Sequence, residues 1–297
     1  MLLRCPAGGG LSTEQDPLGD GERVFEAGWR EVEDGVALRL LRWTPRAAAA
    51  RAPVLFVAGW VSVVEGWAPV LEALTVRRPV VYVETREKRS ARFTRRLSAM
   101  DFTIARLAED LRMLAAAEGL ADGRAVLFGS SMGANAILEA LKGGRLAVRA
   151  AFVVGPNATF HVPWWGHGVI AMPPAAYGLL REPLLWYLRH YRVDARSDPE
   201  QMRRYERTLR DADARRLKLS ARAVANVDTR PGLETVTAPV AVAYAPSDVL
   251  HGADEVRDLV SRIPAAEALE FTTNSAMHSP EVVDRLEAWL ASRGVDG

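Results

Sequence analysis

The sequence predicts an α/β protein built on a doubly wound, mostly parallel sheet with an inserted helical cap. Short continuous apolar runs, typical of strands buried on both faces, alternate with stretches of helical spacing. This alternation indicates parallel strands joined by right-handed crossovers. The chain has 297 residues, 49% of them apolar and 25% charged, which suits one large domain with an insertion.

The first elements are expected to form an antiparallel hairpin at the edge of the sheet. Residues 1–23 are rich in Gly and polar residues without a period, and we expect them to be a loose arm. Residues 29–43 contain a turn at 33–35 and alternating apolar side chains after it, which is typical of a hairpin. The fold is therefore expected to begin near Val24.

The buried strands and the helices between them follow in order along the chain. Strands are expected at 53–59, 79–83, 125–128, 150–154, 239–244 and 269–271. Helices are expected at 67–74, 104–119, 134–141, 253–262 and 280–292. Residues 24–155 and 231–297 are accordingly assigned to the core.

Residues 156–230 interrupt this alternation and are predicted to form the helical cap. The segment is too long for a loop, and it is first aromatic and Pro-rich, then charged, with helices expected at 179–191 and 200–224. Aromatic side chains in such a cap would roof a substrate pocket, or simply pack the cap on the core. The expected pocket residues are Trp60, Phe160, Trp164 and Trp165.

Composition excludes several classes of function. The formal charge of +1 offers no field for nucleic acid, so we expect no nucleic-acid partner. Cys5 is the only cysteine, which rules out an intramolecular disulfide and Cys-rich metal sites. No segment approaches the ~20 apolar residues of a membrane span, and no signal peptide is recognisable. We expect a cytoplasmic protein with no metal and no cofactor, since a Gly-x-Gly-x-x-Gly pattern after a strand is also absent.

One motif carries chemistry, the run Gly129-x-Ser131-x-Gly133 between an expected strand and an expected helix. A sharp turn there would hold the Ser131 hydroxyl above the sheet edge in a strained backbone conformation. Glycine is expected on both sides because a Cβ at either place would collide with the neighbouring strand or helix. The motif therefore predicts that Ser131 is a nucleophile.

A serine nucleophile needs a base and a group that orients the base. Of the five histidines, His278 lies on the loop between the last strand and the last helix, followed by Pro280. Asp248 follows the strand at 239–244, at the end of a parallel strand where α/β sites assemble. We therefore predict His278 as the base and Asp248 as the acid; a solvated loop histidine and an Asx turn are the plainer alternatives.

The Gly-x-Ser-x-Gly turn and the order Ser131, Asp248, His278 resemble the α/β-hydrolase superfamily, in particular its serine-nucleophile members with a helical cap. The resemblance covers the chain from about Trp29 to its C-terminus. It implies that the backbone N–H groups of Trp60 and Met132 bind the oxyanion. In the segment 57–60 that carries this similarity, Ala58 stands where the family usually has histidine.

The resemblance implies a serine hydrolase that cleaves an ester or thioester of a small, apolar or bulky acyl substrate through an acyl-enzyme. An acyltransferase, a C–C hydrolase, a type II thioesterase and a non-covalent cyclase or binding scaffold remain as alternatives on the same fold. Six basic side chains follow the strand at 79–83 and would suit an acyl-carrier protein or a CoA thioester, or would simply be solvated. They are Arg86, Lys88, Arg89, Arg92, Arg95 and Arg96.

Overall fold

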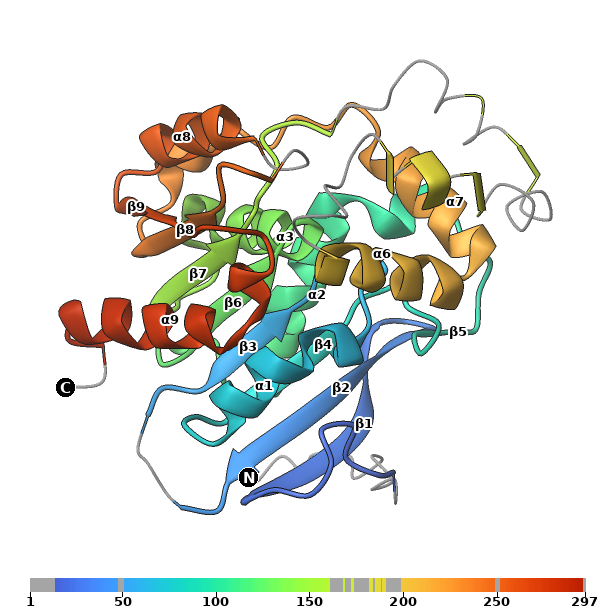
Figure 1. Ribbon diagram of the computed structural model, residues 1–297. Helices are drawn as coiled ribbons and strands as arrows, with labels where there is room; N and C mark the ends of the chain where they lie inside the picture. The colour runs from blue at the N-terminus through green and yellow to red at the C-terminus, as the bar shows by residue number, and fades with distance from the viewer. Residues whose placement is uncertain are drawn as a thin grey trace.

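The computed structural model describes residues 14–47, 51–160, 199–248 and 252–295, together with scattered positions between 168 and 190. Within these residues the strands form one sheet in the order β1-β2-β4-β3-β6-β7-β8-β9, with β5 paired to β2 (Figure 1). The strands are β1 (Arg23–Glu33), β2 (Val36–Pro45), β3 (Val54–Val57), β4 (Val80–Glu84), β5 (Arg92–Phe93), β6 (Val126–Ser130), β7 (Ala150–Val154), β8 (Val240–Tyr244) and β9 (Ala266–Glu270).

The sheet is parallel from β4 to β9 and antiparallel at its first edge. β1 and β2 form a hairpin that closes where Glu33 pairs with Val36, and β2 pairs antiparallel to β4. The remaining neighbours, from β4 and β3 through β8 and β9, run parallel. The predicted edge hairpin on a mostly parallel sheet is thus confirmed.

Helices cover both faces of this sheet (Figure 1). Those described are α1 (Ala68–Thr75), α2 (Ile104–Ala117), α3 (Met132–Leu141), α6 (Pro199–Asp211), α7 (Ala214–Val224), α8 (Ala253–Arg262) and α9 (Pro280–Ser292). Alternate side chains of each strand enter two separate cores. Leu55 and Val57 of β3 pack with α2, α3 and α8, whereas Val54 and Phe56 pack with α1 and α9. The doubly wound architecture is confirmed.

The helix expected over 200–224 is in fact two helices. α6 ends at Asp211, and the side chain of Asp213 accepts a 2.9 Å hydrogen bond from the backbone N–H of Arg216, which caps α7. An aspartate at this position satisfies an N–H that the new helix would otherwise leave without a partner. Of the other helix expected in the cap, over 179–191, the structure describes residues 182, 183, 185–187, 189 and 190, all of them helical.

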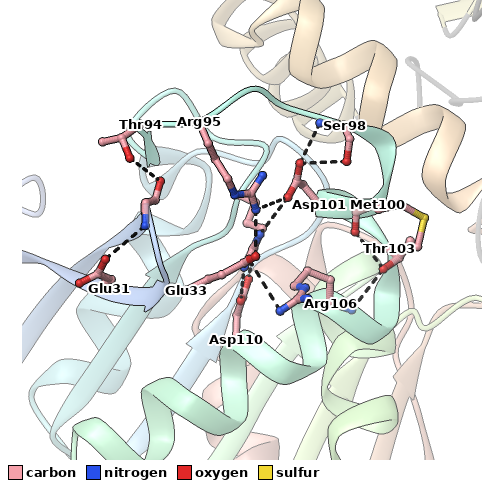
Figure 2. Close-up of polar contacts among 12 residues, drawn as sticks. Glu31, Glu33, Thr94, Arg95, Ser98, Met100, Asp101, Thr103, Arg106 and Asp110 are labelled. Atoms are coloured by element: carbon pink, nitrogen blue, oxygen red, sulfur yellow. Dashed lines mark hydrogen bonds and ion pairs between the residues drawn. The ribbon is translucent and has the colours of Figure 1, made fainter.

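Two of the six basic side chains after β4, Arg86 and Lys88, are buried, contrary to the expectation of a solvated loop, whereas the other four are exposed. Arg86 is fully buried and donates to both carboxylate oxygens of Asp110 on α2, at 2.6 and 2.7 Å. It also donates to Glu33 at 2.9 Å and lies 3.4 Å from Asp101. Figure 2 shows these three carboxylates pointing toward one another. The network ties the end of β1, the turn after β4 and α2 into one unit.

The titration of Asp110 should be visible in the pH dependence of stability. Burial raises the pKa of Asp110 to about 6, while the Arg86 hydrogen bonds act to lower it. Between about pH 4 and pH 6 the folded state then binds more protons at this site than the unfolded state, so Asp110 stabilises the protein less as pH rises. We expect the unfolding free energy of wild type minus that of Asp110→Asn to fall by up to about 3 kcal/mol over this window.

Urea unfolding of the two proteins at several pH values between 4 and 7 measures this difference. The subtraction removes the titration of the other carboxylates. A difference that rises with pH would show that the ion pair with Arg86 outweighs burial.

Candidate active site

Ser131 occupies a strained turn between β6 and α3. Its backbone dihedrals are φ 50° and ψ −119°, a conformation that costs a non-glycine residue roughly 1–3 kcal/mol. Two backbone hydrogen bonds hold it there: the N–H of Ser131 donates to Val154 O at 2.8 Å, and its carbonyl accepts from Asn135 N at 3.0 Å. The turn predicted from the motif is therefore present, with Ser131 at its apex.

The two glycines of the motif are required by close packing. A Cβ on Gly129 would lie 2.5 Å from Ile137 Cδ1, and one on Gly133 would lie 2.2 Å from the carbonyl oxygen of Val57. The second contact is with backbone, which cannot rotate away. The first turn of α3 is thereby pressed against the segment that follows β3.

Gly133→Ala should destabilise the protein strongly, because the backbone after β3 would have to move. Overpacking of this kind costs typically 1–3 kcal/mol, and we expect a loss in the upper part of that range. Gly66→Ala is the matched control, since a Cβ there meets nothing within 4 Å and its φ is not positive. Urea unfolding checks both variants. Equal stability of Gly133→Ala and wild type would contradict the packing described here.

The segment after β3 forms a tight turn beside Ser131. The N–H of Ser62 donates to the carbonyl of Gly59 at 3.1 Å, and Val61 adopts φ 47°, which is unusual for a β-branched residue. A Cβ on Gly59 would lie 3.4 Å from the Cβ of Ser131. The turn that carries Trp60 is thus a direct neighbour of the predicted nucleophile.

The predicted oxyanion donors are located on these two turns. Met132 is the first residue of α3, where helix N–H groups lack partners within the helix. Trp60 is held by its indole, whose Nε1 donates to Ser220 Oγ of α7 at 2.8 Å. Ser220 was not predicted from the sequence. The only signal was its place on the buried side of α7.

His278 ends a short helical turn, residues Ala276–His278, just before α9. Its Nδ1 lies 2.9 Å from the carbonyl oxygen of Asn274. A carbonyl only accepts, so this hydrogen bond places a proton on Nδ1 and leaves the lone pair of the neutral ring on Nε2. That tautomer is the one a general base toward serine requires.

Trp67 connects His278 with the strand that leads to Ser131. The Trp67 ring lies 4.3 Å from the imidazole of His278 and 6.0 Å, edge-on, from the ring of Phe128 in β6. Its Nε1 donates to Ser62 Oγ at 3.1 Å, in the turn beside the nucleophile. From the sequence Trp67 was only the start of an expected helix, and nothing in the pattern indicated this contact.

Asp248 lies in the loop after β8 and is 3% exposed. Its Oδ2 accepts a 2.6 Å hydrogen bond from Nδ2 of Asn274, the residue whose carbonyl contacts His278. Asn274 therefore touches both the predicted acid and the predicted base. Nothing in the sequence indicated a role for Asn274, because an asparagine four residues before a histidine is not a characteristic pattern.

The expected pocket is described only in part. Phe160 and Trp60 are both partly buried against the core that contains α2 and α3. Trp164 and Trp165 lie outside the described residues. Phe160 is fixed by backbone hydrogen bonds to residues just after α7, because its N–H donates to Val227 O and its carbonyl accepts from Asn226 N.

The described part of the chain contains no group of three His, Cys, Asp or Glu side chains arranged to hold a metal ion. In the same residues, every helix is too short or too polar to cross a bilayer.

The fold matches many solved structures. With a thermophilic esterase from Thermogutta terrifontis, the chain shares 19% identity over 93% of its own length and 100% of the esterase, at a TM-score of 0.67. With the enol-lactonase from Burkholderia xenovorans LB400, it shares 17% identity over 90% of its own length and 98% of the lactonase, at a TM-score of 0.68. An alpha/beta hydrolase from Sphaerobacter thermophilus DSM 20745 is 20% identical over 87% of this chain and 98% of that hydrolase, at a TM-score of 0.67.

The chain thus has a doubly wound sheet with a serine turn at the end of β6. This is the α/β-hydrolase fold, as the solved structures show. No protein-family model matches the sequence, and no curated protein matches it by sequence.

Proposed function

We propose that this protein is a serine hydrolase that cleaves a carboxylic ester through Ser131, His278 and Asp248. The observation that carries the proposal is the strained turn that holds Ser131 beside the turn of Gly59 and Trp60. Backbone strain that the surrounding structure holds in place is typical of functional sites. Esterases and a lactonase among proteins of the same fold support the choice of an ester.

The chemistry follows from the roles of these residues. Nε2 of His278 takes the proton of Ser131 Oγ as that oxygen attacks the ester carbonyl carbon. The N–H groups of Trp60 and Met132 bind the oxyanion, and His278 then gives its proton to the leaving alkoxide, which forms the acyl-enzyme. Water, deprotonated by the same nitrogen, releases the acid and restores Ser131.

Asp248 would stabilise the imidazolium that forms in each step. Its buried carboxylate is held by Asn274, whose own carbonyl receives the Nδ1–H of His278. Asp248 and Asn274 would together restrict the imidazole of His278 to one tautomer and one orientation. In a serine, histidine and acid site, the acid has this orienting role.

Residues 156–230 would form the cap over this site, with Phe160 and Trp60 on the side of the acyl pocket. α7 already contacts the turn after β3, since Ser220 accepts from the Trp60 indole. An apolar or bulky acyl group suits aromatic walls. Trp164 and Trp165 remain candidates for the same pocket.

A small-molecule ester is favoured over a carrier-bound thioester because five of the six basic side chains after β4 have internal partners. Besides Arg86, the segment's Lys88 pairs with Glu87, Arg89 donates to Asp211 O and Ala212 O, Arg92 lies over the Trp29 ring, and Arg95 pairs with Asp101. Carboxylates offset the charge of Arg86, Lys88 and Arg95, and neutral groups engage Arg89 and Arg92, so the segment is a weaker site for the phosphate groups of CoA or of a carrier arm than six unengaged cations would be.

Reaction with a fluorophosphonate probe tests the proposal. Wild type should gain one adduct by intact-protein mass spectrometry, whereas Ser131→Ala should gain none. His278→Ala should label at least about 100-fold more slowly, since general-base assistance contributes on that scale.

Ser130→Ala is the matched control, because Ser130 is the adjacent buried serine and should be dispensable for labelling. Hydrolysis of p-nitrophenyl esters is followed in the same proteins. An adduct on folded Ser131→Ala, or full ester turnover by it, would exclude Ser131 as the nucleophile.

A further inference from the structure

A buried ion pair lies beneath the turn that carries Trp60. Glu87 and Lys88 lie three and four residues after the end of β4 and are only 1% and 8% exposed. Lys88 Nζ donates to Glu87 Oε1 at 2.6 Å and to the carbonyl oxygen of Gly59 at 2.7 Å. Glu87 Oε1 also accepts from Thr85 Oγ1 at 2.7 Å and from the N–H of Val61 at 3.3 Å.

The ion pair fixes the orientation of one particular peptide group. The carbonyl of Gly59 and the N–H of Trp60 belong to the same planar trans peptide, so they point in opposite directions. When Lys88 holds the carbonyl on one side, the N–H of Trp60 is directed to the other. Glu87 fixes the following peptide in the same way through the N–H of Val61.

The ammonium group also changes the strength of this N–H as a donor. A cation bonded to a peptide oxygen polarises the peptide, and polarised groups in a low-dielectric interior form stronger hydrogen bonds. This gain in hydrogen-bond strength is largest when the acceptor gains negative charge during the reaction. Lys88 therefore suits a peptide that stabilises an oxyanion.

The composition of the pair argues against a purely structural role. Burying two charges is costly, and apolar residues of similar size often stabilise a protein more. Oε2 of Glu87 is, moreover, buried without a hydrogen-bond partner among the residues that the structure describes. The free-energy cost of burying both charges is explained if the pair fixes the turn of Gly59 and Trp60.

We infer that Lys88 and Glu87 are positioning residues for the oxyanion site, acting through the peptide between Gly59 and Trp60. They provide, from the segment after β4, the support that Ala58, a residue without a polar side chain, cannot give within the turn. The inference rests on the proposed function, because it assigns the Trp60 N–H to the oxyanion.

The test compares Lys88→Met with Lys142→Met in the full chain. Lys142 is the matched control, because its Nζ also donates to a carboxylate, Glu139 at 2.6 Å, and to a backbone carbonyl, Thr229 O at 3.1 Å. The readouts are kcat and KM for a p-nitrophenyl ester, the inhibition constants of a trifluoromethyl ketone and of the methyl ketone of the same chain, and urea unfolding. The trifluoromethyl ketone adds to the serine and forms an oxyanion, whereas the methyl ketone reports ground-state binding.

For Lys88→Met we expect kcat to fall about 30- to 300-fold with KM changed less than about threefold, a smaller loss than the roughly 100- to 1000-fold seen when an oxyanion donor is removed outright. The affinity for the trifluoromethyl ketone should fall by a similar factor, and the affinity for the methyl ketone by less than about threefold, since only transition-state binding is affected. Lys142→Met should keep kcat within about twofold, and Lys88→Arg should recover at least part of the loss.

Glu87→Gln is the second variant, which keeps the oxygen that faces Val61 and serves if Lys88→Met does not fold. We expect it to lower kcat and trifluoromethyl ketone affinity together, by a smaller factor than Lys88→Met. The inference would be overturned by an unchanged kcat in folded Lys88→Met or Glu87→Gln. An equal loss of affinity for both ketones would overturn it as well. Failure of the proposed function would look different, because wild type itself would then neither turn over the ester nor label at Ser131.

Discussion

The contact between the start of α3 and the segment after β3 is the constraint on which the rest of the site depends. Gly133 leaves no room for a side chain because the carbonyl of Val57 occupies that space. This contact places the Ser131 turn and the Gly59–Ser62 turn side by side, each in a conformation that would be unfavourable alone. Two strained turns can persist only where the surrounding core fixes them, and the central strands β3 and β6 supply that core.

The charged segment after β4 supports this contact from the side. Arg86 joins it to α2 and to the hairpin edge, while Glu87 and Lys88 join it to the turn of Gly59. The backbone carbonyls of Lys88 and Ala91 in turn accept from Arg216 of α7. The helices inserted between β7 and β8 are thereby anchored to the same segment that holds the turn of Gly59 and Trp60. A change in their position would be felt at Trp60, whose indole also bonds α7.

Local patterns predicted most of the fold. The β1–β2 hairpin follows from alternation around Gly35, and the Ser131 turn follows from two glycines at fixed spacing between a strand and a helix. Such features depend on residues close in sequence. The break between α6 and α7 was missed because helical periodicity continues across Asp213, which ends one helix and caps the next.

Features that depend on distant partners could not be predicted. Arg86 and Lys88 were expected on the surface because charge usually indicates exposure, yet their partners lie on β1, α2 and the turn after β3. The role of Asn274 between Asp248 and His278 is of the same kind, since it joins two loops that only the sheet brings together. The triad itself remains a proposal that the sequence order first indicated.

A crystal structure of the protein after reaction with a fluorophosphonate would show which side chain is the nucleophile and where the oxyanion binds. We expect phosphorus bonded to Ser131 Oγ, with one phosphoryl oxygen about 2.7–3.1 Å from the backbone nitrogens of both Trp60 and Met132. In the same structure, Lys88 Nζ should still contact Gly59 O. A phosphonate on another residue, or a phosphoryl oxygen directed away from both nitrogens, would contradict the proposed mechanism.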